Sequence, residues 1–327
     1  MRALVTVFLI LSGMVVAATE PGAAPVRART RVQTGSDWPT FLGPSGNGTS
    51  PETGIRTDWS GGLPIAWQTD LGEGYSMGSV AGGRLFLFDR MGDDASLTAR
   101  DARTGLVRWT ATYPSQYEDL YGYSLGPRAS PVVDGERVYT LGVEGRLRCH
   151  RAEDGGLLWE VDTVSRFGVV QNFFGVGSTP VVEGDLLITM VGGSPPGSPP
   201  TRSGAVEGNG TGLVAFDKRS GEVRWTLSDE LASYSTPRVV TLGGRRRGFA
   251  FTRGGLLGFD PVRGTRDFFF PWRARKLESV NAATPVVVDD TVFISETYGP
   301  GGVLLKVPAS GDPEVVWRDG RRNRSLA

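Results

Sequence analysis

One segment near the C-terminal end of the chain combines groups that could hold a charged ligand. Glu278 and Asn281 offer carboxylate and amide oxygens, which are common ligands of a hard cation. Arg275 stands just before them and could orient an anion. The same residues also fit a polar turn, in which the charges are solvated and Asn281 satisfies backbone groups. The segment therefore predicts either a ligand site or a turn, and the turn is the simpler interpretation.

A second set of candidate residues is aromatic and polar, and it recurs at corresponding places along the chain. Its members are Tyr75, Tyr123, Arg128, Asn172 beside Phe173, and Tyr234. Stacked aromatic rings with a few polar groups are typical of a site for a small ligand or a peptide. Ordinary packing between strands explains them equally well. If the segments that carry these residues converge, we expect them to line one funnel.

The reactive side chains and the charges exclude several classes of protein. Cys149 is the only cysteine and His150 the only histidine, so an internal disulfide, a zinc finger and a histidine metal cluster are out of reach. We expect His150 to pack within a strand. The 35 basic and 35 acidic residues balance, which gives no overall field to attract nucleic acid. The arginines after position 317 are interpreted as a solvated tail.

A repeated frame decides where the candidate residues lie. It reads Ala-x-Asp-x-x-Thr/Ser-Gly-x-x-x-Trp, and residues 99–109 and 215–225 match it at every position. Residues 149–159, residues 258–268 and a copy that ends at Trp317 match it more loosely. A Ser-Pro or Thr-Pro pair precedes four of the copies, at intervals of 48 to 57 residues. The aromatic residues that close the frames are Trp109, Trp159, Trp225, Phe268 and Trp317.

Each repeat predicts four short antiparallel strands. The apolar strand after Ser/Thr-Pro ends at an Asp-Gly or Glu-Gly turn, such as Asp134-Gly135, where glycine supplies the positive φ that a hairpin needs. The Asp-x-x-Thr/Ser-Gly turn separates the last two strands. No copy shows a helical period, which disfavours a helical solenoid. We therefore predict an all-β propeller of four-stranded blades over residues 38–327, with the closing aromatic rings packed between blades.

The N-terminus carries the features of an export signal. Residues 1–18 have a basic start, a short apolar run and a small-residue end, which predict a secretory signal peptide. An uncleaved membrane anchor is the alternative. Residues 19–37 are polar and irregular and are interpreted as a linker. We therefore expect a periplasmic or secreted protein with no transmembrane domain in the mature chain.

The frame resembles the tryptophan-docking repeat of PQQ-like β-propellers, a group that includes quinoprotein alcohol dehydrogenases and BamB. The segment from Trp38 to Gly48 is similar to the N-terminal lead of PQQ-repeat proteins from planctomycetes and related bacteria. The family usually has seven or eight blades, and five are counted here. A strand around Trp67 looks like the outer strand of the last blade, supplied by the N-terminus. We therefore expect an incomplete ring and a C-terminally truncated chain.

The resemblance implies two possible functions. A quinoprotein dehydrogenase would need PQQ, calcium and usually a vicinal cysteine pair, and this chain has one cysteine and no Cys-x-x-Cys-His haem motif. We therefore expect an exported binding and scaffold module without catalysis or cofactor, which presents loops to a protein partner or a small ligand, also by β-augmentation. The alternative is a PQQ- and calcium-dependent oxidoreductase that uses Glu278, Asn281 and Arg275. No nucleic-acid partner is expected.

Overall fold

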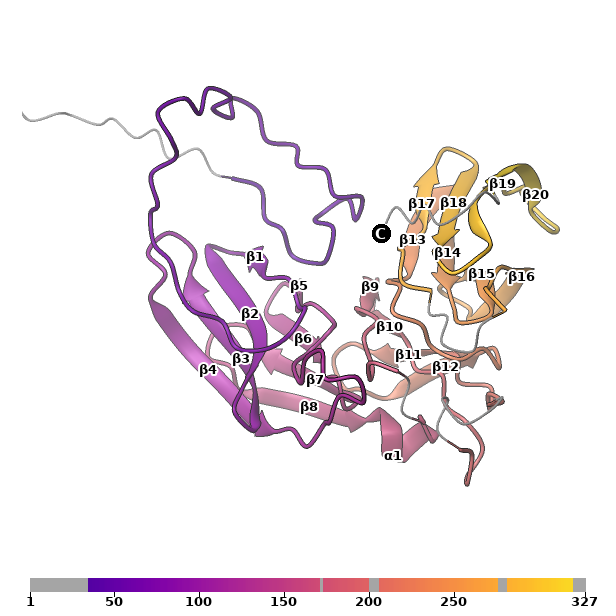
Figure 1. The fold of residues 1–327 in the computed structure, drawn as a ribbon, viewed down its shortest axis with the longest axis horizontal. Coiled ribbons are helices and arrows are strands. Elements are labelled where there is room, and N and C mark those ends of the chain that lie inside the picture. Colours follow the sequence, from indigo (N-terminus) through magenta and orange to yellow (C-terminus); the bar gives the residue numbers. More distant parts are fainter. Residues whose placement is uncertain (1–34, 171–172, 200–205, 276–280, 320–327) are drawn as a thin grey trace, which may run out of the picture. The chain divides into compact units, whose positions relative to one another are not determined.

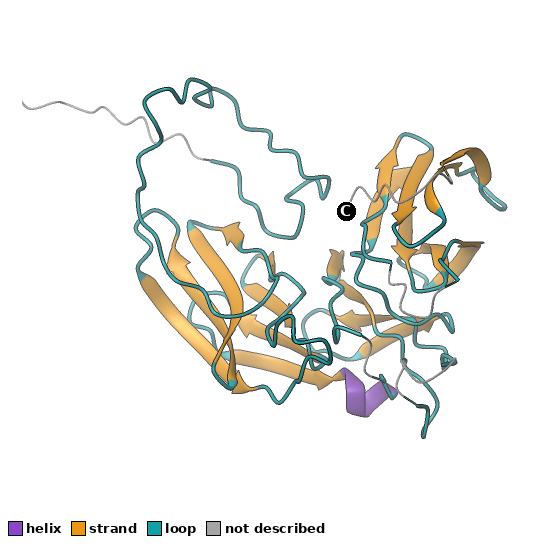
Figure 2. Cartoon of the chain, viewed as in Figure 1, coloured by secondary structure: helices purple, strands orange, loops and turns teal. Residues whose placement is uncertain are grey.

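The computed structural model describes residues 35–170, 173–199, 206–275 and 281–319. These residues form twenty strands and one short helix (Figure 1), and strands dominate the fold (Figure 2). The strands make five four-stranded antiparallel sheets, each paired in the order of the sequence. The prediction of an all-β protein with five four-stranded blades is confirmed. The predicted signal peptide and most of the predicted linker lie outside the described residues.

The five sheets are called blades 1 to 5 in chain order. Blade 1 comprises β1 (Ser79–Ala81), β2 (Arg84–Met91), β3 (Asp94–Asp101) and β4 (Val107–Pro114). Blade 2 comprises β5 (Val132–Asp134), β6 (Arg137–Leu141), β7 (Arg146–Arg151) and β8 (Leu157–Asp162), and blade 3 comprises β9 (Val181–Glu183), β10 (Leu186–Met190), β11 (Leu213–Asp217) and β12 (Val223–Leu227). Blade 4 comprises β13 (Arg238–Leu242), β14 (Arg245–Phe251), β15 (Gly255–Asp260) and β16 (Thr265–Pro271), and blade 5 comprises β17 (Val286–Val288), β18 (Thr291–Glu296), β19 (Gly301–Lys306) and β20 (Glu314–Asp319).

A single turn of helix, α1 (Thr163–Phe167), follows blade 2 directly. Asp162 caps it, because its carboxylate accepts a hydrogen bond from the Ser165 backbone N–H, and Gly168 ends it in a left-handed conformation. Within the described ranges, no helix has the length and apolar character needed to cross a membrane.

The Asp-x-x-Thr/Ser-Gly frame forms the turn between the third and fourth strands of a blade. Asp101 Oδ1 accepts hydrogen bonds from the backbone N–H and the hydroxyl of Thr104, both at 2.9 Å. Gly105 follows with φ +73°, a conformation that glycine adopts without steric cost. In blade 3, the Arg224 side chain also bonds Asp217 and lowers the pKa of that carboxyl to about 2. The aspartate is therefore ionised and holds the turn at neutral pH.

A register shift recurs between the third and fourth strands of all five blades. It sets the closing aromatic residue opposite a residue that is small in four of the blades. Trp109 pairs with Ala99, and Phe268 pairs with Gly258, where a Cβ would lie 2.2 Å from the Phe268 ring. The other pairs are Trp159 with Cys149, Trp225 with Ala215 and Trp317 with Leu304. The small residue in the frame makes room for the ring.

Tryptophans of the frame connect one blade to the turn of the next. Trp109 Nε1 donates to the Ala152 carbonyl at 3.1 Å, and its ring lies on Gly155, where a Cβ would come within 2.6 Å of Cε3. Trp159 repeats this contact with the Lys218 carbonyl, at 3.2 Å, and with Gly221. Gly155 and Gly221 are thus required twice, for their positive φ and for the ring that lies on each.

The segment before blade 1 makes the same contact. Trp67 Nε1 donates to the Ala102 carbonyl at 3.1 Å, and its ring lies on Gly105. No strand forms around Trp67, which differs from the predicted outer strand. A strand requires a hydrogen-bonded neighbour, and no described strand pairs with this segment. Trp67 therefore has the position of a frame tryptophan without the strand that usually carries it.

The interface between blades 4 and 5 is built differently. Phe268 is buried there at 2% exposure, but its side chain has no N–H to donate. Trp272 supplies one instead, to the Gly301 carbonyl at 3.0 Å. Four apolar clusters form the core, and each joins two consecutive blades. The core thus consists of interfaces between sheets, as expected for repeats that each bury one face on a neighbour.

Candidate functional site

A cavity of about 380 Å³ lies where segments that precede the innermost strands of four blades meet. Its lining residues are Tyr75, Tyr123, Arg128, Phe174, Gly177 and Tyr234. They precede β1, β5, β9 and β13. The structure thus brings together four of the five residues predicted to line a funnel, and the fifth, Asn172, lies outside the described residues. We call this cavity the aromatic pocket.

The walls of the aromatic pocket are rings in mutual contact. Phe174 lies 5.7 Å from Tyr123, 5.6 Å from Tyr121 and 5.6 Å from Tyr234, measured between ring centroids. The Tyr234 hydroxyl accepts a hydrogen bond from the Phe174 backbone N–H at 2.7 Å, which fixes both residues. Burial raises the pKa of Tyr234, so its hydroxyl stays protonated at neutral pH. The outermost ring, Tyr123, is 67% exposed and forms the rim.

Arg128 lines the pocket, but its charge is already balanced. It forms an ion pair with Asp119 at 2.9 Å, and the Asp119 side chain is fully buried. The guanidinium also lies 5.0 Å from the ring centroid of Tyr75. Its nitrogen atoms donate to three backbone carbonyls, those of Ser124, Gly126 and Phe174. With most of its N–H groups engaged, Arg128 positions the pocket walls and leaves a cavity suited to a neutral, apolar or aromatic group.

Sequence reasoning missed four residues of this site. Phe174 and Gly177 line the pocket, and Tyr121 and Asp119 support it from the loop before β5. The aromatic density of residues 117–123 was a signal for Tyr121. Gly177 matters because a Cβ there would lie 2.6 Å from Tyr234 Cδ1 and 2.9 Å from Arg128 Cβ. The need for glycine at position 177 could not be predicted from the sequence, because it depends on which side chains lie beside it in space.

The predicted cofactor residues lie only partly within the described ranges. Glu278 lies outside the described residues, and Arg275 is exposed. Asn281 is 1% exposed, and its amide nitrogen donates to the Thr252 carbonyl at 2.7 Å. Its Oδ1 is buried and accepts no hydrogen bond from a described residue. Calcium takes about six to eight oxygen ligands. Among the described residues, Asn281 supplies one oxygen of the predicted set.

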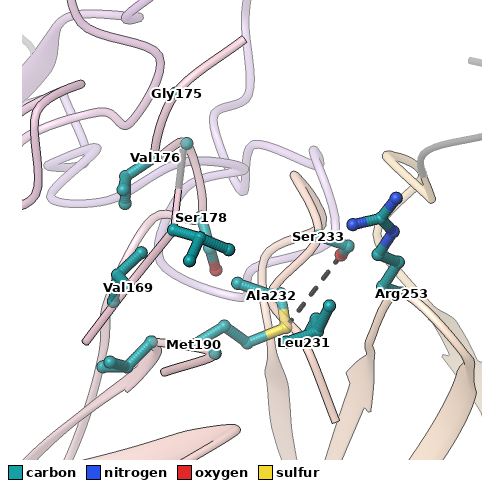
Figure 3. A pocket seen from close by; sticks show the side chains of 13 residues that line it. Val169, Gly175, Val176, Ser178, Met190, Leu231, Ala232, Ser233 and Arg253 are labelled. Atoms are coloured by element: carbon teal, nitrogen blue, oxygen red, sulfur yellow. Dashed lines mark hydrogen bonds between the residues drawn. The ribbon is translucent and has the colours of Figure 1, made fainter. Parts of the chain in front are cut away.

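A smaller cavity lies between blades 3 and 4 (Figure 3). Val169, Val176 and Leu231 supply its apolar wall, and Ser233 Oγ points to Met190 Sδ at 4.0 Å. Its volume is about 20 Å³, and one water needs about 10–15 Å³ measured in this way. This cavity is therefore a packing gap with room for one water, and too small for a ligand.

The single cysteine and the single histidine lie in the interior of blade 2. Burial raises the pKa of Cys149 to about 12, which keeps it a thiol. His150 is 2% exposed, its Nδ1 lies 2.9 Å from the Gly155 carbonyl oxygen, and burial lowers its pKa. Across the described ranges, no three His, Cys, Asp or Glu side chains gather as a metal site. Both residues have a packing role.

Four-stranded antiparallel blades, joined by tryptophans that lie on the glycine turn of the next blade, define a β-propeller built from PQQ-like repeats. The family described as outer membrane protein assembly factor BamB matches residues 56–194 and 93–322, and this chain belongs to it. Among curated protein sequences, none matches the chain.

Two solved structures share the fold. BamB from Moraxella catarrhalis is 21% identical, with a TM-score of 0.55, and the match covers 80% of this chain and 69% of that protein. Quinohemoprotein alcohol dehydrogenase from Comamonas testosteroni is 15% identical, with a TM-score of 0.57 and coverage of 89% of this chain. The chain spans 48% of the length of that dehydrogenase. At these identities the likeness concerns the fold.

Proposed function

We propose that this protein is an exported binding module of the bacterial envelope, without catalysis, and that its aromatic pocket receives an apolar or aromatic side chain of a protein partner. The observation that carries the proposal is the pocket of about 380 Å³ with its rim of exposed tyrosines. Aromatic anchors that fill such pockets supply much of the binding energy at protein interfaces. The family description, which names an outer membrane assembly factor, supports the envelope and a protein partner.

The charges of the site favour an uncharged group over an anion or a cation. Asp119 already neutralises Arg128, so an anionic ligand would gain little. A cation would meet the guanidinium that lies over Tyr75. A neutral ring can stack on Tyr123 and Phe174 without displacing either interaction. The pocket therefore fits an aromatic or aliphatic anchor best.

The proposal can be tested by cross-linking in intact cells. A photoreactive benzoylphenylalanine replaces Tyr123 at the rim, and in a second strain it replaces Tyr298, which is 54% exposed in blade 5. We expect one discrete cross-linked protein from position 123 and none from position 298. Gly177→Ala narrows the pocket and should remove that product. Gly61→Ala is the matched control, because its nearest contact would be an Arg56 nitrogen at 3.7 Å, and it should leave the product unchanged.

The dehydrogenase alternative is tested on the purified protein by tryptophan fluorescence during a PQQ titration with and without calcium. We expect no saturable quenching. Quenching that requires calcium and is lost in Glu278→Ala, together with no cross-link from position 123, would replace the binding module by a quinoprotein enzyme.

A further inference from the structure

The N-terminal lead, residues 38–48, crosses the innermost strands of several blades. Trp38 pairs with Val80 of β1 through two backbone hydrogen bonds of 2.7 and 2.8 Å. The Pro39 carbonyl then accepts from the Val133 N–H of β5 at 2.8 Å. The lead is thus bound to blades 1 and 2 and continues toward blade 4.

A cavity of about 330 Å³ lies between this lead and the inner strands of blades 2, 3 and 4. Three polar side chains of its wall are Thr236, Arg238 and Thr284. Arg238 Nη2 donates to the carbonyl of Ser45 in the lead at 3.1 Å. Both threonines line the cavity, and neither hydroxyl makes a hydrogen bond to another residue in the described ranges. We call this space the lead cavity, and it shares no lining residue with the aromatic pocket.

Arg238 breaks the repeat at this position. The residue after Ser-Pro or Thr-Pro is Val132 in blade 2, Val181 in blade 3 and Val286 in blade 5, and it is Arg238 in blade 4. An arginine in a slot that is otherwise valine gives up apolar packing. Departures of this kind from a repeat are expected at functional positions.

The charge of Arg238 has no counter-ion in the described part of the chain. Two other charged residues line the lead cavity, and each has its own partner. Asp134 pairs with Lys218 at 2.6 Å, and Arg246 pairs with Glu183 at 2.5 Å. Half-burial lowers the pKa of Arg238, although an arginine remains protonated at neutral pH. The lead cavity therefore contains one uncompensated positive charge.

We propose that the lead cavity binds a small oxyanion, a phosphate or a carboxylate group, through the guanidinium of Arg238 and the hydroxyls of Thr236 and Thr284. A guanidinium presents paired N–H groups that match the oxygens of either anion. The volume admits a ligand larger than the anion itself, since one water needs about 10–15 Å³ measured in the same way. This site is separate from the proposed partner pocket and does not depend on it.

The test measures the thermal midpoint of the purified protein against inorganic phosphate and against citrate, at an ionic strength held constant with sodium chloride. We expect a saturable rise with at least one of them, and the anion that saturates at the lower concentration identifies the phosphate or the carboxylate source. Arg238→Val, which installs the residue of the other blades, should fold and should weaken binding at least tenfold. Arg238→Lys should retain part of the affinity.

Arg137 is the control, because it also lacks an ion pair among the described residues and lines a different cavity beside Arg84 and Arg151. Arg137→Val should leave the anion effect unchanged. The proposal is overturned if neither anion shifts the midpoint beyond chloride. It is also overturned if the shift persists in Arg238→Val or disappears in Arg137→Val, which would assign binding to the other arginines.

Discussion

The interfaces between blades and the aromatic pocket use the same repeats in opposite ways. At the interfaces, residue types recur, so that Trp109 lies on Gly155 as Trp159 lies on Gly221. In the pocket, positions recur but residue types change from blade to blade. Between blades 1 and 2 and between blades 2 and 3, the interfaces repeat one arrangement, a tryptophan on a turn glycine. The pocket is open and asymmetric, as a surface that must distinguish one partner from others requires. Three substitutions sharpen this comparison.

The largest effect is expected from Gly155→Ala. Alanine at φ +76° costs about 1–2 kcal/mol, and displacing the Trp109 ring, 2.6 Å from the new Cβ, adds a similar amount. Gly135→Ala in the same blade is the control, because its φ is +56° and nothing lies within 4 Å of its Cβ position. In urea unfolding, Gly155→Ala should therefore lose clearly more free energy of unfolding than Gly135→Ala. Equal losses would mean that the ring contact contributes nothing.

A smaller effect is expected from Trp109→Phe, which removes a hydrogen bond of 3.1 Å to the Ala152 carbonyl. We expect a loss of about 1–2 kcal/mol in the free energy of unfolding, from the hydrogen bond and the smaller ring. Trp225→Phe is the comparison, since the buried Trp225 Nε1 has no acceptor among the described residues. Trp225→Phe should therefore lower the free energy of unfolding by about 1 kcal/mol less than Trp109→Phe does. The reverse order would show that the N–H contacts do not stabilise the interfaces.

The smallest effect concerns acid stability and uses the single histidine. Burial lowers the pKa of His150, so the folded protein keeps it neutral while the unfolded chain takes up a proton below about pH 6.5. The stability it contributes is complete above that pH and is lost as the pH falls toward its folded pKa, with a slope of at most about 1.4 kcal/mol per pH unit. His150→Asn should remove this share of the decline between pH 7 and 5. An unchanged slope would mean that burial does not lower the pKa of His150 in the folded protein.

Much of the fold was predictable, because the residues that form the turns and strands recur at fixed positions of the repeat. The turn at Asp101 and Gly105 was predictable, because aspartate accepts hydrogen bonds from the turn backbone and glycine adopts a positive φ. The interface between blades 4 and 5 was less predictable. There the frame has Phe268, whose side chain has no N–H, and the hydrogen bond to the next blade comes from Trp272, which lies outside the frame. A substitution in a motif is visible in sequence, but the residue that compensates for it is found only in space.

The candidate site was predictable in its members and not in its chemistry. Tyr75, Tyr123, Arg128 and Tyr234 were expected together, since equivalent positions of successive repeats converge when blades pack side by side. The neutralisation of Arg128 by Asp119 was not expected, because an ion pair depends on how one loop folds back. The same holds for Arg238, whose missing counter-ion becomes evident only when its neighbours are known.

By itself, the sequence determined the blade: its four strands, its turns and the aromatic residue that closes it, because these depend on local backbone preference and on a period that repeats. Only the tertiary structure decided which cavities exist, which arginine is neutralised and which is not, and where the lead crosses the inner strands. Those properties depend on contacts between residues that are distant in the chain, so a local sequence pattern does not predict them.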